Sequence, residues 1–464
     1  MTAGGCIFLK RALTQEERYQ QMMTEPVSRL IPRMAAPTII SMLVTSIYNM
    51  ADTFFVSQIN TSASAAVGII FSMMAIIQAF AFMIGMGSGN VISRLLGQKK
   101  AERAAQYAAV GFFTELILGL CIAVFGLAHL DRLVYWLGAT ETIAPYAMDY
   151  ARYILIAAPF MMCSFGMNNM LRFQGNSFYA MIGITTGGVL NMILDPLFIF
   201  GLGLGISGAA IATGFSQFIS FCILLSQCNR MPSCISISPR NFRPSLGMYR
   251  QIISCGLPSL ARQGIASIAV ILLNFSAHPY GDAAIAAMSI VNRFSMFINS
   301  AIIGFGQGFQ PVCGFNFGAK NYKRVIESYN FCVRVSFLVL LVLGVLTFLF
   351  AEPVVTVFRR EDAEVIRIGT VALRCQAAVF PLLAQVTMSN MFTQTIGYSG
   401  RATIVASLRQ GICLIPILLI LPPLIGLPGI QLAQPLSDTL SAVIAFFITR
   451  KILAELREAA REQT

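Results

Sequence analysis

Residues 107–128 read YAAVGFFTELILGLCIAVFGLA, an apolar run in which Glu115 is the single charged side chain. A helix of about 20 apolar residues crosses the hydrocarbon core of a bilayer. Similar runs recur along almost the whole chain, unlike the short alternating segments of a membrane β-barrel. The sequence therefore predicts an all-α integral membrane protein with twelve transmembrane helices. The predicted spans are 34–57, 65–92, 107–128, 143–170, 178–201, 205–228, 251–277, 283–312, 325–350, 364–391, 402–424 and 428–449.

The composition agrees with a surface that faces lipid. Hydrophobic residues make up 56% of the 464 residues and charged residues only 11%, whereas soluble domains carry about 25% charged residues. The net charge of +12 would suggest nucleic acid on a soluble domain. Here the basic residues lie in short loops and tails, where they set topology, so no nucleic-acid partner is expected. The 11 cysteines are scattered without C-x-x-C spacing, and neither disulfides nor a zinc site is predicted.

Two glycine motifs occur twice, about 220 residues apart. Gly85-Met-Gly-Ser-Gly89 recurs as Gly304-Phe-Gly-Gln-Gly308, and Gly205-Ile-Ser-Gly208 recurs as Gly426-Leu-Pro-Gly429. Tight helix packing would explain each glycine singly, but not the paired recurrence. With six spans in each copy, the two halves share one orientation and are related by a pseudo-two-fold axis along the membrane normal. This pattern predicts two six-helix lobes around a central cavity, as in an alternating-access transporter.

The predicted domain organisation follows from the spans and from a polar, basic, proline-bearing linker between the halves. Lysine and arginine concentrate in the two tails, the linker and alternate loops, which predicts a multi-pass protein of the inner (plasma) membrane with both termini in the cytoplasm. Thr14 and Glu17 fit a helix capping box within the first tail. The predicted segments are a cytoplasmic or interfacial tail (1–30), the N-lobe (31–228), the linker (229–250), the C-lobe (251–450) and a cytoplasmic tail (451–464).

Four oxygen-bearing side chains are predicted to share one layer in the outer half of the N-lobe. Asp52 lies 19 residues beyond Arg33, roughly 28 Å along the first helix. Asp195, Asn191 one turn before it, and Thr213 fall at similar depths in the fifth and sixth spans. Two carboxylates close together in a low dielectric cannot both remain charged, so this layer is predicted to capture H⁺ or Na⁺.

The coupling hypothesis has a mechanical part and a simpler alternative. Pro37 lies about four turns below Asp52 and is a candidate hinge of the first helix. Occupancy of the acidic layer would then bias that hinge. In the alternative, both aspartates only cap or snorkel near outer helix ends. No other cofactor, and no metal beyond Na⁺ at this site, is predicted.

At these residues the chain resembles the multidrug and toxic compound extrusion (MATE) family over about residues 28–450. The matching stretches are Ile47-Tyr-Asn-Met-Ala-Asp52-Thr-Phe-Phe-Val, Asn191-Met-Ile-Leu-Asp195-Pro and Gly205-Ile-Ser-Gly-Ala-Ala-Ile-Ala-Thr213. The resemblance implies twelve helices in two lobes and antiport of organic compounds against H⁺ or Na⁺. It also implies an N-lobe cation site, a bending proline and two nearby polar residues. The residues that match are Asp52, Asn191, Asp195 and Thr213 for the cation site, Pro37 for the bend, and Tyr48 and Asn168 for its neighbours.

The expected function is thus secondary active efflux of amphipathic, often cationic, small molecules from the bilayer by a monomer. A flippase for lipid-linked sugar precursors is the alternative, because it would need a cationic cavity for a pyrophosphate. An enzyme is not expected, since the sequence has no nucleophile–base pair, metal-ligand spacing or phosphate loop. The arginines that keep the flippase open lie in C-lobe spans: Arg262, Arg293, Arg374 and Arg409.

Overall fold

The computed structural model describes residues 13–358 and 362–463, and the secondary structure of these residues is helical, with no β-strand among them. Positions 1–12 and 464 of the two predicted tails lie outside the described residues. The first helix is α1 (Gln15–Thr24), and its predicted capping box is confirmed. The Thr14 hydroxyl accepts a hydrogen bond from the Glu17 amide at 3.2 Å, and Glu17 accepts one from the Thr14 amide at 2.7 Å.

The first lobe is built from six long helices and two short elements. The short elements are α5 (Leu130–Trp136), which lies between the third and fourth long helices, and the π-helical turn η1 (Leu197–Gly201), which continues the fifth. The long helices are α2 (Val27–Ser57), α3 (Thr61–Gly97), α4 (Ala101–Ala128), α6 (Ala144–Phe173), α7 (Ser177–Pro196) and α8 (Gly205–Arg230).

The second lobe repeats this arrangement after a connection that carries only the short turn η2 (Pro239–Asn241). Two further short elements are η3 (His278–Tyr280) and α12 (Ala351–Phe358). The fifth long helix of this lobe is again irregular, because α14 (Ser399–Ser407) passes through the π-helical turn η4 (Leu408–Ile412) into α15 (Leu414–Ile425). The other long helices are α9 (Leu246–Ala277), α10 (Asp282–Gly318), α11 (Tyr322–Leu349), α13 (Ala363–Thr395) and α16 (Leu427–Arg461).

Helix lengths support the predicted membrane-spanning architecture. Among the described residues, 11 helices are long and apolar enough to cross a membrane. The twelfth is α16, whose 35 residues extend roughly 52 Å at 1.5 Å per residue and pack against α13. Large apolar side chains such as Phe275 and Phe125 are 78% and 72% exposed, as expected for surfaces that contact lipid tails.

Predicted and observed helix bounds agree at one end of the bundle and differ at the other. At the predicted outer end, α2 ends at Ser57 and α9 at Ala277, as the spans 34–57 and 251–277 predict. At the opposite end the helices run past the apolar segments, and α16 continues to Arg461 instead of ending near residue 449. Helices α8 and α9 likewise enter the predicted linker, which shortens it to residues 231–245.

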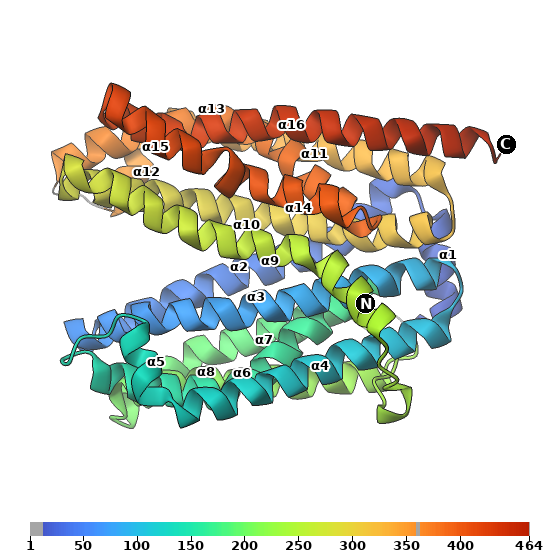
Figure 1. The fold of residues 1–464 in the computed structure, drawn as a ribbon, viewed down its shortest axis with the longest axis horizontal. Coiled ribbons are helices and arrows are strands. Elements are labelled where there is room, and N and C mark those ends of the chain that lie inside the picture. The colour runs from blue at the N-terminus through green and yellow to red at the C-terminus, as the bar shows by residue number, and fades with distance from the viewer. Residues whose placement is uncertain (1–12, 359–361, 464) are drawn as a thin grey trace, which may run out of the picture.

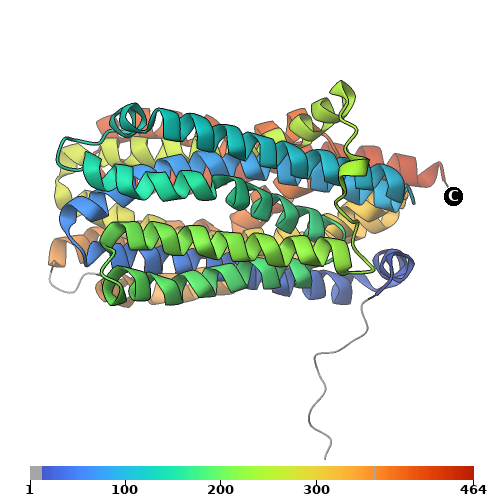
Figure 2. The same ribbon diagram turned by 90° about the horizontal axis from the view of Figure 1, so that it is seen from below.

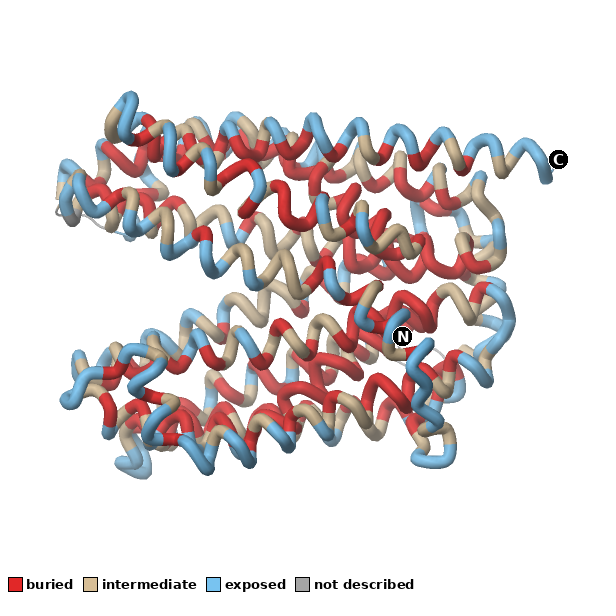
Figure 3. Tube along the Cα trace, viewed as in Figure 1, coloured by how far each residue is buried: buried red, intermediate tan, exposed pale blue. Residues whose placement is uncertain are grey.

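The two lobes lie side by side, with their long helices along a common axis (Figures 1 and 2). They diverge toward the end that carries α5 and α12, and they approach each other toward the end where the chain terminates (Figure 1). Figure 3 shows buried residues concentrated inside each lobe and where the lobes meet. The seam between them is formed chiefly by α2 with α10, and by α3 with α9 and α10.

Gly97 and Gly318, which occupy equivalent positions 221 residues apart in the two halves, allow the helices of the two lobes to approach closely along this seam. A Cβ on Gly97 would lie 2.1 Å from the Phe315 carbonyl oxygen, and one on Gly318 would lie 2.0 Å from the Arg94 carbonyl oxygen. The contacts are reciprocal, because each carbonyl lies three residues before the other glycine. Such reciprocity is what a two-fold axis produces. The sequence repeat is therefore a repeat in three dimensions.

A pair of asparagines repeats the same symmetry inside the lobes. The Asn168 amide donates to the Ala180 carbonyl at 2.9 Å, and the Asn390 amide donates to the Ala402 carbonyl at 3.1 Å. Each bond ties the fourth long helix of its lobe to the start of the fifth. Both asparagines thus hold equivalent turns in the two copies.

Candidate functional site

Three of the four predicted layer residues are joined by hydrogen bonds. The Asn191 amide donates to Asp195 Oδ1 at 3.1 Å and to Thr213 Oγ1 at 3.2 Å. Asn191 and Asp195 lie one turn apart on α7, so their side chains share one face. Asp195, Asn191 and Thr213 are all buried, at 0%, 3% and 5% exposure.

The fourth residue, Asp52, reaches this group from α2. Tyr150 of α6 donates a hydrogen bond from its hydroxyl to Asp52 Oδ2 at 3.4 Å. Tyr150 is fully buried and lies close enough to both carboxylates to interact with them electrostatically. Asp52 and Asp195 also interact electrostatically with each other. Four helices of one lobe therefore converge on a single polar site.

Three oxygen atoms of this site are buried without a hydrogen-bond partner among the residues that the structure describes. They are Asp52 Oδ1, Asn191 Oδ1 and Asp195 Oδ2. Unpaired buried acceptors are unfavourable unless a proton or cation occupies them. Carboxylate, amide and hydroxyl oxygens suit H⁺ or Na⁺. Within the described residues, no group of three or more His, Cys, Asp or Glu side chains gathers as a transition metal would require.

The backbone around Asp195 explains why the side chain is held at this point. Pro196 follows it directly, and α7 passes into the π-helical turn η1, where the Leu202 amide bonds to the Leu197 carbonyl at 2.9 Å. Such turns inside helices are frequent at functional sites. Gly208 lets α8 approach closely, because a Cβ there would lie 2.7 Å from the Phe198 carbonyl.

Tyr48 lies beside the site, one turn below Asp52 on α2. Its side chain is 8% exposed and packs against Gly188 of α7, where a Cβ would lie 3.0 Å from the tyrosine ring. It also interacts electrostatically with Asp52. Tyr48 thus fills the space between α2 and α7 below the polar layer.

Asn168, the other suggested neighbour, does not belong to the same layer. Its amide donates to the carbonyl of Ala180 at the start of α7, whereas Asp195 is near the end of that helix. At 1.5 Å per residue these two positions are roughly 22 Å apart along the axis. Asn168 therefore ties α6 to α7 away from the acidic pair.

Pro37 lies inside α2, which is helical from Val27 to Ser57. Close to it, Thr38 donates to the Gly304 carbonyl across the lobe boundary at 2.6 Å. Gly308 brings α10 equally close, since a Cβ there would lie 2.4 Å from Ala35 Cα. The proline is therefore placed where α2 packs on the opposite lobe. A bend of α2 at Pro37 remains a prediction.

Tyr150 is the site residue that the sequence reasoning missed. It lies six residues into α6, and Thr213 lies eight residues into α8. Both helices are predicted to descend from the outer side, so the depth argument that found Thr213 also applies to Tyr150. Depth along the helix was therefore the signal that could have found Tyr150.

Comparison with known proteins gives consistent matches over nearly the full chain. The MatE family model matches residues 37–197 and 258–420. The multidrug export protein MepA of Staphylococcus haemolyticus is 27% identical over 423 residues, which cover 89% of this chain and 91% of that protein. MepA of Staphylococcus aureus strain MRSA252 is 25% identical over 447 residues, or 94% of this chain and 96% of that protein.

Solved structures share the fold at comparable identity. A multidrug resistance MATE family transporter of the MOP superfamily in an outward-facing conformation superposes with a TM-score of 0.89 and 28% identity, over 94% of this chain and 98% of that one. A MOP superfamily transporter from Pyrococcus furiosus superposes with a TM-score of 0.89 and 27% identity, over 97% of this chain and 100% of that one. The binding pocket of that transporter is described as having reversed polarity, which suggests a different function.

Proposed function

Since this chain belongs to the MatE family, we propose that it is a secondary active multidrug efflux transporter that exchanges amphipathic, often cationic, organic compounds for H⁺ or Na⁺ by alternating access. The similarity to proteins named as multidrug exporters supports the activity, because it extends over about nine-tenths of both chains. The two-lobed bundle supports alternating access, because its lobes touch at one end and diverge at the other.

The observation that carries the coupling proposal is the set of unpaired oxygens on Asp52, Asn191 and Asp195. When both carboxylates are charged they repel each other across a medium of low dielectric. A proton or Na⁺ that binds between them removes that repulsion and draws α2 toward α7. Tyr150 and Thr213 orient the carboxylate and amide groups by hydrogen bonds.

Helix α2 connects the ion site with the seam between the lobes. Asp52 lies near the C-terminal end of α2. Pro37 precedes it by 15 residues, roughly 22 Å along the helix. At the level of Pro37, α2 packs on Gly304 and Gly308 of α10. A bend at the proline would change this inter-lobe contact. Ion binding at Asp52 would thereby shift the balance between conformations open to opposite sides.

The proposed setting is the plasma membrane, crossed many times by a monomer with both termini in the cytoplasm. The concentration of lysine and arginine at the end where the lobes meet supports this orientation. In that orientation the lobes diverge toward the outside, so this conformation corresponds to the outward-open state of the proposed transport cycle.

A lipid-linked sugar flippase is less well supported, because three of the C-lobe arginines already have partners within that lobe. Arg262 donates to Asn390 at 3.2 Å, Arg409 forms an ion pair with Asp438 at 2.8 Å, and Arg374 stacks over the Phe348 ring. Such arginines brace helices instead of presenting charge to a pyrophosphate.

Dye efflux from inverted vesicles, driven separately by a pH gradient and by a Na⁺ gradient, tests the proposal. Asp52→Asn and Asp195→Asn are expected to abolish gradient-driven transport while cationic dyes still bind. Asp131→Asn, an exposed acid on α5, is the matched control and should transport as the wild type does. Unchanged transport in both site variants would refute the coupling site. The gradient that drives the wild type identifies the ion.

A further inference from the structure

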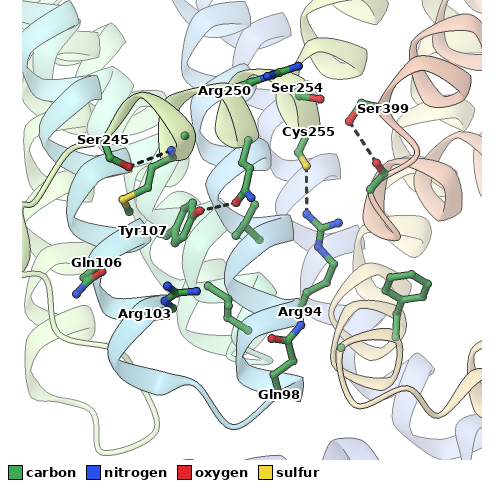
Figure 4. Close-up of a pocket in the computed structure, with 18 of the residues that line it drawn as sticks. Arg94, Gln98, Arg103, Gln106, Tyr107, Ser245, Arg250, Ser254, Cys255 and Ser399 are labelled. Carbon is green, nitrogen blue, oxygen red and sulfur yellow. Dashed lines mark hydrogen bonds between the residues drawn. The ribbon is translucent and has the colours of Figure 1, made fainter.

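A cavity of about 1170 Å³ lies at the end of the molecule where the two lobes meet (Figure 4). Its walls come from both lobes. The N-lobe contributes the end of α3 and the start of α4, and the C-lobe contributes the start of α9, the end of α10 and the start of α14. The cavity is far from the acidic layer, because Arg94 lies at the opposite end of α3 from the α2–α3 connection that follows Asp52.

Five cationic side chains line this cavity, and no acidic side chain does among the described residues. None of the five takes part in an ion pair within the described chain. In Figure 4, Arg94 extends from α3 toward Cys255 of α9. The Arg94 guanidinium donates to Cys255 Sγ at 3.2 Å, and a thiol is a weak acceptor. The five residues are Arg94, Arg103, Arg243, Arg250 and Lys320.

Helix starts add further positive potential to the same walls. Helix α9 begins at Leu246, and its first turn lines the cavity through Gly247 and Met248. The start of α14 does so through Ser399, and that of α11 through Tyr322. The first amides of a helix lack intrahelical partners, and the helix dipole makes this end an anion-binding position. Three helix starts and five cations thus converge on one space.

Topology alone does not require this convergence. Basic residues on the cytoplasmic side orient the chain wherever they lie in loops and tails. Arg450 and Arg457, which are exposed near the end of α16, meet that need without lining the cavity. Cations gathered from both lobes repel one another across the seam. A bound anion would offset this repulsion between the lobes.

We propose that this cavity binds a phosphate-bearing anion, which bridges the two lobes at the end where they meet. Guanidinium groups match phosphate oxygens with paired hydrogen bonds. The helix-start amides that have no cap supply further donors, whereas the Met248 amide is already bound by Ser245 and the Arg324 amide by Asn321. The volume accommodates more than one phosphate group or a whole phospholipid headgroup. The same chemistry is offered by anionic lipid of the adjacent leaflet and by a soluble polyphosphate, so both sources enter the test.

Cys255 provides a built-in reporter of occupancy. It lines the cavity, is 5% exposed and contacts Arg94. The alkylation rate of Cys255 by a charged maleimide is measured by peptide mass spectrometry on the full-length protein. Pyrophosphate is added to protein in neutral detergent at constant ionic strength. In parallel, nanodiscs of phosphatidylglycerol are compared with nanodiscs of phosphatidylcholine. At ten times the Kd, roughly one cavity in eleven is empty, so alkylation slows about tenfold.

The double variant Arg103→Gln/Arg250→Gln removes two cavity cations without touching the Arg94–Cys255 contact. In this variant, the phosphate ligand is expected to lose most of its protection of Cys255 against alkylation, whereas the matched variant Arg450→Gln/Arg457→Gln retains that protection. Protection by pyrophosphate supports a soluble phosphate ligand, and protection only in phosphatidylglycerol supports a lipid headgroup. Absence of protection from both sources overturns the proposal, as does equal protection in the two double variants.

Discussion

Close approach of the lobes should make one glycine of α9 sensitive to a single added methyl group. A Cβ on Gly256 would lie 1.9 Å from the Met83 carbonyl oxygen of α3, where real Cβ atoms do not approach below 3.0 Å. The obstacle is backbone, so no side chain can rotate away, and the helices would have to separate by about 1 Å. Gly87 meets the Ile252 carbonyl in the same way at 2.1 Å, which leaves α3 no room to retreat along the seam.

We expect Gly256→Ala to destabilise this conformation by about 1–3 kcal/mol, the usual range for overpacking. The matched variant is Gly264→Ala, two turns further along α9, where nothing lies within 4 Å of an added Cβ. That change should stabilise the protein by about 0.5–1 kcal/mol, because alanine favours a helix over glycine. Thermal unfolding in detergent should therefore move the two midpoints in opposite directions. Equal midpoints, or a higher one for Gly256→Ala, would refute the role given to the seam.

Three further predictions concern buried polar groups. Glu115 is fully buried, and neither of its carboxyl oxygens has a hydrogen-bond partner within the described residues. Glu115→Met should therefore raise the free energy of unfolding by about 1–3 kcal/mol and raise the thermal midpoint; a lower midpoint would contradict this. Asn168→Ala and Asn390→Ala remove equivalent hydrogen bonds and should each cost about 1–3 kcal/mol; a marked inequality in unfolding would contradict the symmetry. Tyr150→Phe deletes the hydroxyl that donates to Asp52 and should shift the pH profile of dye efflux without loss of expression; an unchanged profile would remove Tyr150 from the site.

The sequence predicted the helix number, the two lobes and the duplicated glycines because these depend on apolar length and on repeated spacing. It was less accurate at the helix ends where the two lobes meet. Hydrophobicity reports where a helix leaves lipid, whereas the hydrogen-bonded helix of α16 continues through charged residues as far as Arg461. The short helix α5 was also missed as a helix, since its seven residues resemble an interfacial loop in composition.

Within the site, depth along a helix could be predicted, but the direction of a side chain around the helix could not. Asp195, Asn191 and Thr213 come together because both their height and their face agree. Asn168 lies at a different depth from the acidic pair, because it bonds to Ala180 at the start of α7, whereas Asp195 is near the end of that helix. Contacts between lobes, such as Thr38 with Gly304, depend on how the repeats dock and leave no trace in the local pattern.

The two lobes share a scaffold but differ in the partners of their buried acids, and this difference favours the N-lobe for the proposed coupling ion. In the C-lobe, Asp438 is fully buried and accepts hydrogen bonds from Arg409 at 2.8 Å, Gln376 at 2.7 Å and Gln434 at 2.8 Å. Its charge is already balanced by a permanent cation, so a proton or Na⁺ would gain little there. In the N-lobe, Asp52 and Asp195 have no arginine partner among the described residues, and each retains an unpaired oxygen. A bound proton or Na⁺ would balance them, so the coupling proposed above places the responsive site in the N-lobe.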